Sequence, residues 1–351
     1  MFKCLDDLES RINPEEENAL YLSWVDFLEG RYPHALFMPS RKETYPAKYK
    51  WPKVSVNQAI DEYEKMAISQ FAMCSDLLAQ GSGGMMGVRS NYGTGILATL
   101  FGTKIYMMEE HMETLPTVWP LDSIDVIKRV VDAGVPDLYN SYGGHALEMA
   151  EIYAELLTDY PKISRFVHLY HPDLQGPMDI CELLCGSKIF TYIYDYPDLI
   201  HALLELITDT YIQFLNKWYQ IIPPTEKYSV HWWFMHKGQI MLRDDSAMNF
   251  SPAMVDEFVL PYDQRLLNEF NGGAIHFCGK GDHYIESMCN MDQLHCIHMS
   301  QPEYNDIEMI LANTVDKGIK ILEFPEELAV SLCNEGRQFS GNMHCKPSSV
   351  E

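Results

Sequence analysis

Apolar side chains recur every three or four residues after Ser55, which is the period of one face of an α-helix. The stripe consists of Ile60, Tyr63, Ala67, Phe71, Cys74 and Leu78. Gly81 follows the stripe and suits the left-handed residue that ends many helices. A second long helix is expected from Pro197, with a stripe of Leu199, Leu203, Leu206, Phe214 and Trp218. Ser251-Pro252 combines an N-cap residue with proline at the first helical position, which favours a third helix.

Short apolar strands alternate with helical segments in the last third of the chain. Strands are expected at 273–279, 293–299, 318–323 and 341–345, with helices at 305–316 and 326–335. Repetition of this unit about every 20–25 residues predicts parallel strands with helical crossovers. An open nucleotide-binding sheet usually carries a glycine-rich loop after its first strand. The nearest candidate, 81–87, follows a helix and is read as a cap leading into a strand, so a single (β/α)₈ barrel is expected.

The first part of the chain shows no clear hydrophobic period and holds prolines at positions 14, 33, 39, 46 and 52. We therefore expect a short helix and an irregular N-terminal arm over 1–54. The barrel domain is expected over 55–351, because no linker or low-complexity segment interrupts that range.

Composition limits the classes of function. Apolar residues make up 47% and aromatic residues 12% of the 351 residues, enough for a sizeable core and unlike a disordered chain. The net charge of −24 disfavours binding to nucleic acid or to anionic membrane surfaces. No apolar run reaches the ~18 residues of a membrane span, and charges stand where a signal peptide would be apolar. A cytoplasmic protein is expected, and its oligomeric state is left open.

The nine cysteines are scattered and odd in number, so they do not form a disulfide framework, and a few are candidates for metal ligands. His276 and Cys278 lie two residues apart near the end of a predicted strand, so their side chains point the same way. Imidazole and thiolate together suit zinc, and the carboxyl ends of barrel strands are where active sites form. Cys345 ends the last predicted strand and is the candidate third ligand, which would leave a fourth position open.

Other readings of these residues compete with the metal site. Strand cysteines are most often buried core residues. Cys296 and His298 share a strand face in the same way, although no glycine ends that strand. Cys181 and Cys185 lie one helical turn apart around two leucines, which favours a place in the core.

Several short motifs resemble the uroporphyrinogen decarboxylase superfamily, in the same order and over about residues 80–345. They are Gln175-Gly-Pro-Met-Asp179, Asp244-Asp245-Ser, Phe250-Ser-Pro252, Pro261-Tyr262, His276-Phe-Cys-Gly279 and Gln301-Pro302. The resemblance implies a (β/α)₈ barrel with its active site in a cleft at the carboxyl ends of the strands. It does not cover the N-terminal arm.

Two branches of that superfamily differ in their chemistry. The decarboxylases carry an arginine-rich N-terminal motif that binds acidic side chains, of which Gly30-Arg31-Tyr32-Pro33 retains one arginine. The chain is more similar to the methylcobamide:coenzyme M methyltransferases, whose H-x-C motif and distant final cysteine match His276, Cys278 and Cys345. This resemblance implies one zinc ion per chain, a methyl donor carried by a corrinoid protein and a thiol-type acceptor. Only six residues follow Cys345, whereas the family often continues with a longer tail.

Further site residues are expected around this zinc. Asp244 and Asp245 are candidate catalytic residues that orient a ligand or the substrate, although an exposed turn is the alternative. Gln175 and His231 are candidate substrate-binding residues, although 231–235 also reads as core packing. The D-x-H-x-x-G cobalamin loop is absent, so the corrinoid is expected on a separate protein. The alternatives are a carboxy-lyase that acts on a porphyrinogen or smaller carboxylate, and a non-catalytic binding barrel.

Overall fold

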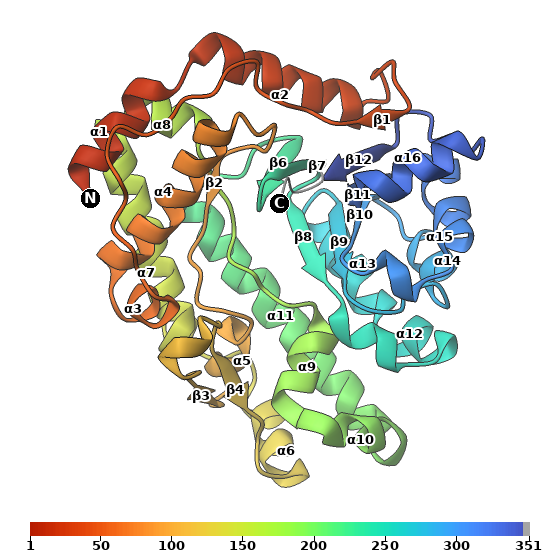
Figure 1. The fold of residues 1–351 in the computed structure, drawn as a ribbon. Helices are drawn as coiled ribbons and strands as arrows, with labels where there is room; N and C mark the ends of the chain where they lie inside the picture. Colours follow the sequence, from red (N-terminus) through yellow and green to blue (C-terminus); the bar gives the residue numbers. More distant parts are fainter. Residues whose placement is uncertain (347–351) are drawn as a thin grey trace.

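The computed structural model describes residues 1–346 and has a parallel sheet at its centre (Figure 1). Six parallel strands pair in the order β1 (Leu36–Phe37), β12 (Met343–Lys346), β11 (Lys320–Pro325), β10 (Leu294–Met299), β9 (Gly273–Phe277) and β8 (Ile240–Arg243). The four strands predicted for the last third of the chain are therefore confirmed, with ends shifted by at most two residues. A second parallel pair joins β2 (Gly87–Val88) to β5 (His168–Leu169).

Single contacts link the two parallel sheets. Ser40, just after β1, bridges Ser82, which precedes β2. The N–H of Gly176 donates to the carbonyl of Arg243 at 2.8 Å, which joins the segment after β5 to β8. The predicted parallel α/β architecture is thus confirmed. Within residues 1–346 the strand ladder does not run round a full ring, so closure into an eight-stranded barrel stays a prediction.

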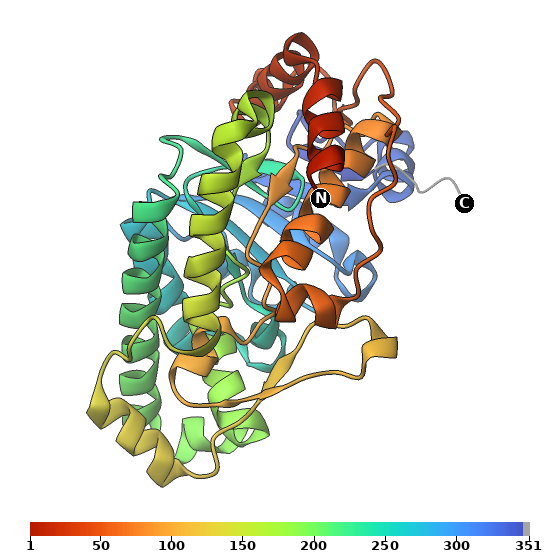
Figure 2. The same ribbon diagram turned by 90° about the vertical axis from the view of Figure 1, so that its left-hand side faces the viewer.

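Helices pack against the strands from outside (Figure 1). They are α3 (Val56–Asp61), α4 (Tyr63–Gln80), α5 (Ile96–Leu100), α6 (Ile124–Ala133), α7 (Ser141–Leu156), α8 (Pro161–Phe166), α9 (Pro177–Cys185), α10 (Ile189–Asp195), α11 (Pro197–Ile221), α12 (Pro252–Phe258), α13 (Leu260–Glu269), α14 (Ile285–Met288), α15 (Ile307–Asn313) and α16 (Glu326–Asn334). Figure 2 shows α7 and α11 running side by side. A hairpin of β3 (Lys104–Tyr106) and β4 (Thr117–Trp119) lies before α6.

The predicted helix signals are confirmed. Gly81 ends α4 in the left-handed conformation, with a φ of 66°. The Ser251 side chain accepts the N–H of Met254 at the start of α12. None of the helices within residues 1–346 combines the length and the hydropathy that crossing a bilayer requires.

The first 54 residues are more ordered than the sequence pattern indicates. They form α1 (Phe2–Arg11), α2 (Pro14–Leu28) and β1, and β1 pairs with β12 in the central sheet. The expected irregular arm is corrected in this respect, whereas the division at residues 54 and 55 stays a prediction. Pro14 occupies the first position of α2, where its missing N–H costs nothing.

A hairpin of β6 (Tyr228–His231) and β7 (Phe234–Lys237) packs against one face of the sheet. That face, called the inner face below, presents the buried side chains of Met241, Ala274, Cys296 and Leu322 to the hairpin and to α2. The opposite, outer face carries Leu242, Ile275, Ile297 and Ile321 in the larger core with the helices. Side chains alternate along a strand, so a residue two positions from one of these inner-face residues also points inward.

Candidate metal centre

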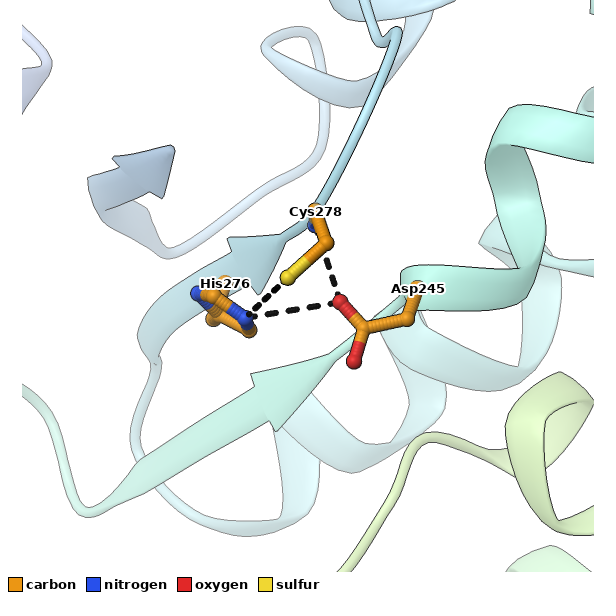
Figure 3. Close-up of side chains that lie close together, drawn as sticks. All are labelled: Asp245, His276 and Cys278. Atoms are coloured by element: carbon orange, nitrogen blue, oxygen red, sulfur yellow. Dashed lines mark hydrogen bonds and ion pairs between the residues drawn. The ribbon is translucent and has the colours of Figure 1, made fainter. Parts of the chain in front are cut away.

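The ends of β8 and β9 bring together the side chains of Asp245, His276 and Cys278 (Figure 3). The Nε2 atom of His276 lies 3.3 Å from Sγ of Cys278 and 3.4 Å from Oδ1 of Asp245. The backbone N–H of Cys278 donates to the same Oδ1 atom at 2.8 Å. One donor atom from each residue lies within 4.8 Å of the others, so a single ion can contact all three.

Local chain geometry explains why these side chains meet. His276 has the inner-face parity of Ala274, and Cys278 follows directly after β9 on the same side. Asp245 begins a 3₁₀ turn (Asp245–Asn249) after β8. The N–H groups of Asp245 and Ser246 donate to the Asp179 carboxylate of α9 at 3.0 and 2.7 Å. These two hydrogen bonds hold the turn so that Asp245 faces β9.

The donor set fits zinc. Ligand atoms 2.0–2.3 Å from a tetrahedral zinc ion are about 3.3–3.8 Å apart, and the two His276 distances lie in that range. Nitrogen, sulfur and carboxylate oxygen are all common zinc donors. Three protein ligands leave one position open, which is the arrangement of a catalytic rather than a structural zinc site.

The other ring nitrogen of His276 belongs to a buried chain of hydrogen bonds. Its Nδ1 atom lies 2.8 Å from Nδ1 of His298 on β10, and Nε2 of His298 lies 3.0 Å from Oε2 of Glu323 on β11. A carboxylate accepts, so Nε2 of His298 donates its hydrogen to Glu323. Nδ1 of a neutral His298 then accepts from Nδ1–H of His276. This tautomer leaves Nε2 of His276 free to bind a metal ion.

The protonation states agree with this picture. Burial lowers the pKa of His298, which favours the neutral ring. Burial and the nearby Asp245 carboxylate raise the pKa of Cys278 to about 11, so its thiol keeps its proton in the metal-free chain. Burial alone would raise the pKa of Asp245, but its hydrogen bonds to His276 and Cys278 hold that pKa below the usual value.

A buried cluster of one aspartate and two arginines lies beside the metal centre. Asp173 pairs with both Arg89 and Arg243, and all three side chains are nearly excluded from solvent. Burial would raise the pKa of Asp173, but the two guanidinium groups outweigh it and keep that pKa low. Arg243 also stacks on Trp232 at the tip of the hairpin, 4.3 Å from the ring centroid. The Trp232 ring lies 5.4 Å from the ring of His276 and 5.1 Å from that of His298.

The structure does not bring Cys345 to this centre. The ring of His344 lies 4.6 Å from that of Trp24 on α2, so His344 points to the inner face. Because side chains alternate along a strand, the next residue, Cys345, points to the outer face. There Cys345 is buried in the larger core with Met343. Among the described residues, Asp245 completes the group in the place that the sequence prediction gave to Cys345.

The two adjacent aspartates have different surroundings. Asp244 points away from the metal centre, and its carboxyl is buried beside that of Asp263 on α13. Burial raises the pKa of Asp244 well above the usual value and that of Asp263 to about 8, so this pair holds a proton at neutral pH. The exposed-turn alternative therefore does not apply to Asp244.

Gln175 and His231 line separate cavities. Gln175 lines a cavity of about 350 Å³ together with Asp245. His231 lines another, of about 430 Å³, with Tyr170 and His171. Its Nδ1 is 2.7 Å from Nε2 of His236, and burial pushes the pKa of His231 well below its usual value. His231 thus belongs to the β6–β7 hairpin, and its role in substrate binding stays a prediction.

Several residues of the centre were missed or set aside in the sequence. His298 belongs to the competing pair with Cys296, but Cys296 lies in the inner apolar core. Arg243 and Glu323 carried a usable signal, because Arg243 ends the apolar strand β8 and Glu323 is a charge directly after the apolar residues of β11. Asp173 and Arg89 carried none, since only the fold places them beside Arg243.

Comparisons with known proteins identify a shared fold. No family model matches the chain, and no curated protein matches it in sequence. Among solved structures, it resembles a methyltransferase from Methanosarcina mazei, with a TM-score of 0.54 and 15% sequence identity. The match covers 94% of each chain. The protein therefore has the fold of a methyltransferase over nearly its whole length, and the superfamily suggested by the motifs stays a prediction.

Proposed function

We propose that the protein is a zinc-dependent methyltransferase that moves a methyl group between a corrinoid protein and a thiol-type acceptor. The observation that carries this proposal is the Asp245, His276 and Cys278 group, located at strand ends in a fold shared with a methyltransferase. Closure of the strands into a (β/α)₈ barrel is part of the same proposal, because active sites of such barrels form at this end.

The reaction needs a thiolate, because a neutral thiol is a weak nucleophile. Zinc would supply a Lewis acid that lowers the pKa of an acceptor thiol. The chain's part is to hold that ion through His276, Cys278 and Asp245. Glu323 and His298 keep the His276 ring in the tautomer with a free Nε2. Trp232 of the hairpin packs against the centre from its inner side, with its ring 5.4 Å from that of His276.

Methyl transfer to the thiol balances without a further oxidant or reductant. The carbon–cobalt bond of the methylated corrinoid breaks and leaves its electron pair on cobalt. A carbon–sulfur bond forms to the acceptor, and the thiol proton passes to solvent. Asp245 and Cys278 are only partly buried, so an acceptor and a second protein can reach this end of the sheet.

The test follows the demethylation of methylcobalamin by small thiols, with zinc-loaded and chelated protein in parallel. We expect the rate to fall by at least 100-fold on chelation and in His276→Ala. Cys333→Ala, a cysteine outside the centre, is the control and keeps the rate. Equal rates with and without zinc would exclude the proposal. Zinc-independent decarboxylation of a porphyrinogen would favour the carboxy-lyase instead.

A further inference from the structure

A cavity of about 350 Å³ opens beside the metal centre and shares Asp245 with it. It is bounded by α9 and by the turn after β8. The lining residues include three with carboxyl groups, namely Asp179, Glu182 and Asp245. The rest are neutral, and none of them is lysine, arginine or histidine. The space next to the centre is therefore built to face a positive or neutral group rather than an anion.

The neighbouring arginines do not offset this charge. The guanidinium groups of Arg89 and Arg243 are both paired with Asp173 and do not line the cavity. Glu182 accepts a hydrogen bond from the hydroxyl of Ser246, which fixes its carboxylate at the cavity wall. A ligand in the cavity thus meets the fixed carboxylate of Glu182 without a basic partner. Asp245 is a candidate metal ligand, and burial raises the pKa of Asp179 well above its usual value.

Gln175 gives an independent sign of a ligand. The residue is 95% buried, given its exposed fraction of 5%, and it lines the cavity. Within the described residues its Nε2 amide has no hydrogen-bond partner. A buried amide without a partner costs free energy, so such a group in a cavity wall is a donor waiting for an acceptor atom.

We propose that the methyl acceptor is a small aminothiol-type molecule whose ammonium group lies beside the Glu182 carboxylate of this cavity while its sulfur faces the metal centre. The sulfur of the molecule, which is its one acceptor atom when the amine is protonated, receives the N–H of Gln175. This inference rests on the proposed function, and it adds the chemical class of the acceptor. Anionic thiols are disfavoured because they would place like charges together in a partly buried space.

The experiment measures thiol binding to the cobalt(II)-substituted protein from the change in the thiolate-to-metal absorption band. Three probes share a two-carbon chain: cysteamine (cationic), 2-mercaptoethanol (neutral) and 2-mercaptoethanesulfonate (anionic). We expect cysteamine to bind at least tenfold more tightly than the sulfonate at low ionic strength. The difference should shrink at high salt, which screens charges.

Variants locate the effect. Glu182→Gln keeps the acceptor for Ser246 and removes the charge, so it should weaken cysteamine binding and leave 2-mercaptoethanol unchanged. Glu151→Gln, an exposed change on α7, is the matched control and should change none of the three. Gln175→Leu should weaken cysteamine binding, and unchanged binding would show that the thiol does not occupy this cavity.

The two levels of the proposal fail in different ways. Equal or tighter binding of the sulfonate would overturn the aminothiol inference and leave thiol activation intact. A cobalt spectrum that no thiol changes would overturn the proposed function, and the inference would fall with it.

Discussion

The Nδ1 atoms of His276 and His298 lie 2.8 Å apart, on neighbouring parallel strands whose Cα atoms are paired in register. Only one hydrogen fits between two such nitrogens, so the tautomer of one ring determines that of the other. Glu323 sets the direction by accepting from the far side of His298. Glu323 on β11 therefore determines, through His298, which ring nitrogen of His276 is free to bind the metal ion.

His298→Leu should weaken zinc binding by roughly 10–100-fold, because His276 loses the partner that fixes its tautomer and ring orientation. His298→Asn retains a polar group and should recover part of the affinity. The measurement is competitive zinc titration with a chromophoric chelator. Because the Leu variant also changes packing, thermal unfolding of both variants without metal serves as the control. Equal zinc affinity of the wild type and the Leu variant would contradict the role given to His298.

The purified chain should bind one zinc ion, and His276→Ala or Cys278→Ala should abolish stoichiometric binding. Asp245→Asn should also weaken it, since the third donor atom becomes a poorer ligand. Cys345→Ala should keep the metal because its side chain lies on the outer face. Elemental analysis after gel filtration gives the result, with Cys333→Ala as a cysteine control. Loss of zinc in Cys345→Ala would restore the ligand set predicted from the sequence.

The buried Asp244–Asp263 pair should make stability fall as the pH rises. The folded state keeps a proton on Asp263 up to a pKa of about 8, whereas the unfolded chain loses it near the ordinary pKa of 3.8. Between these values the folded state binds the proton that the unfolded chain has lost, so this one proton on Asp263 lowers the free energy of unfolding by up to about 1.4 kcal/mol per pH unit. Asp263→Asn should flatten this dependence and raise stability at pH 7.

Urea unfolding between pH 5 and pH 8.5 measures the effect, and exposed Asp256→Asn on α12 is the control. A pH dependence of the Asp263→Asn variant identical to that of the wild type would contradict a proton held by this pair.

The ion pair between Glu17 of α2 and Arg41 after β1 should be important for stability. It is bidentate, at 2.6 and 2.7 Å, and both side chains are almost completely buried. Glu17→Ala leaves a buried guanidinium without its partner, which should lower the free energy of unfolding by about 3–5 kcal/mol. The pair of Arg31 with Asp26 is more than half exposed, so Asp26→Ala should cost at most about 1 kcal/mol. Guanidinium denaturation of the two variants compares them directly.

Periodicity alone was enough for much of the fold. The four late strands, the left-handed Gly81 and the Ser251 cap all follow from local rules, because hydrophobic spacing and capping depend on neighbouring residues. Local pattern failed over the first 54 residues. There α2 is held by contacts of Trp24 and Phe27 with β1 and β12, more than 300 residues away in the case of His344.

The residues of the candidate site likewise fall into those that local sequence could place and those that depend on long-range packing. Alternation along one strand was sufficient to place His276 and Cys278 on one side, since the two residues are close in sequence. The sequence could not choose between Asp244 and Asp245, because the choice depends on a turn that α9 holds through Asp179. It also could not give the direction of Cys345, because the pairing of β12 with β1 and β11 determines which face of this short strand points inward. Side-chain direction within an element is a local property, whereas the meeting of elements is set by long-range packing, and the third ligand belongs to the second kind.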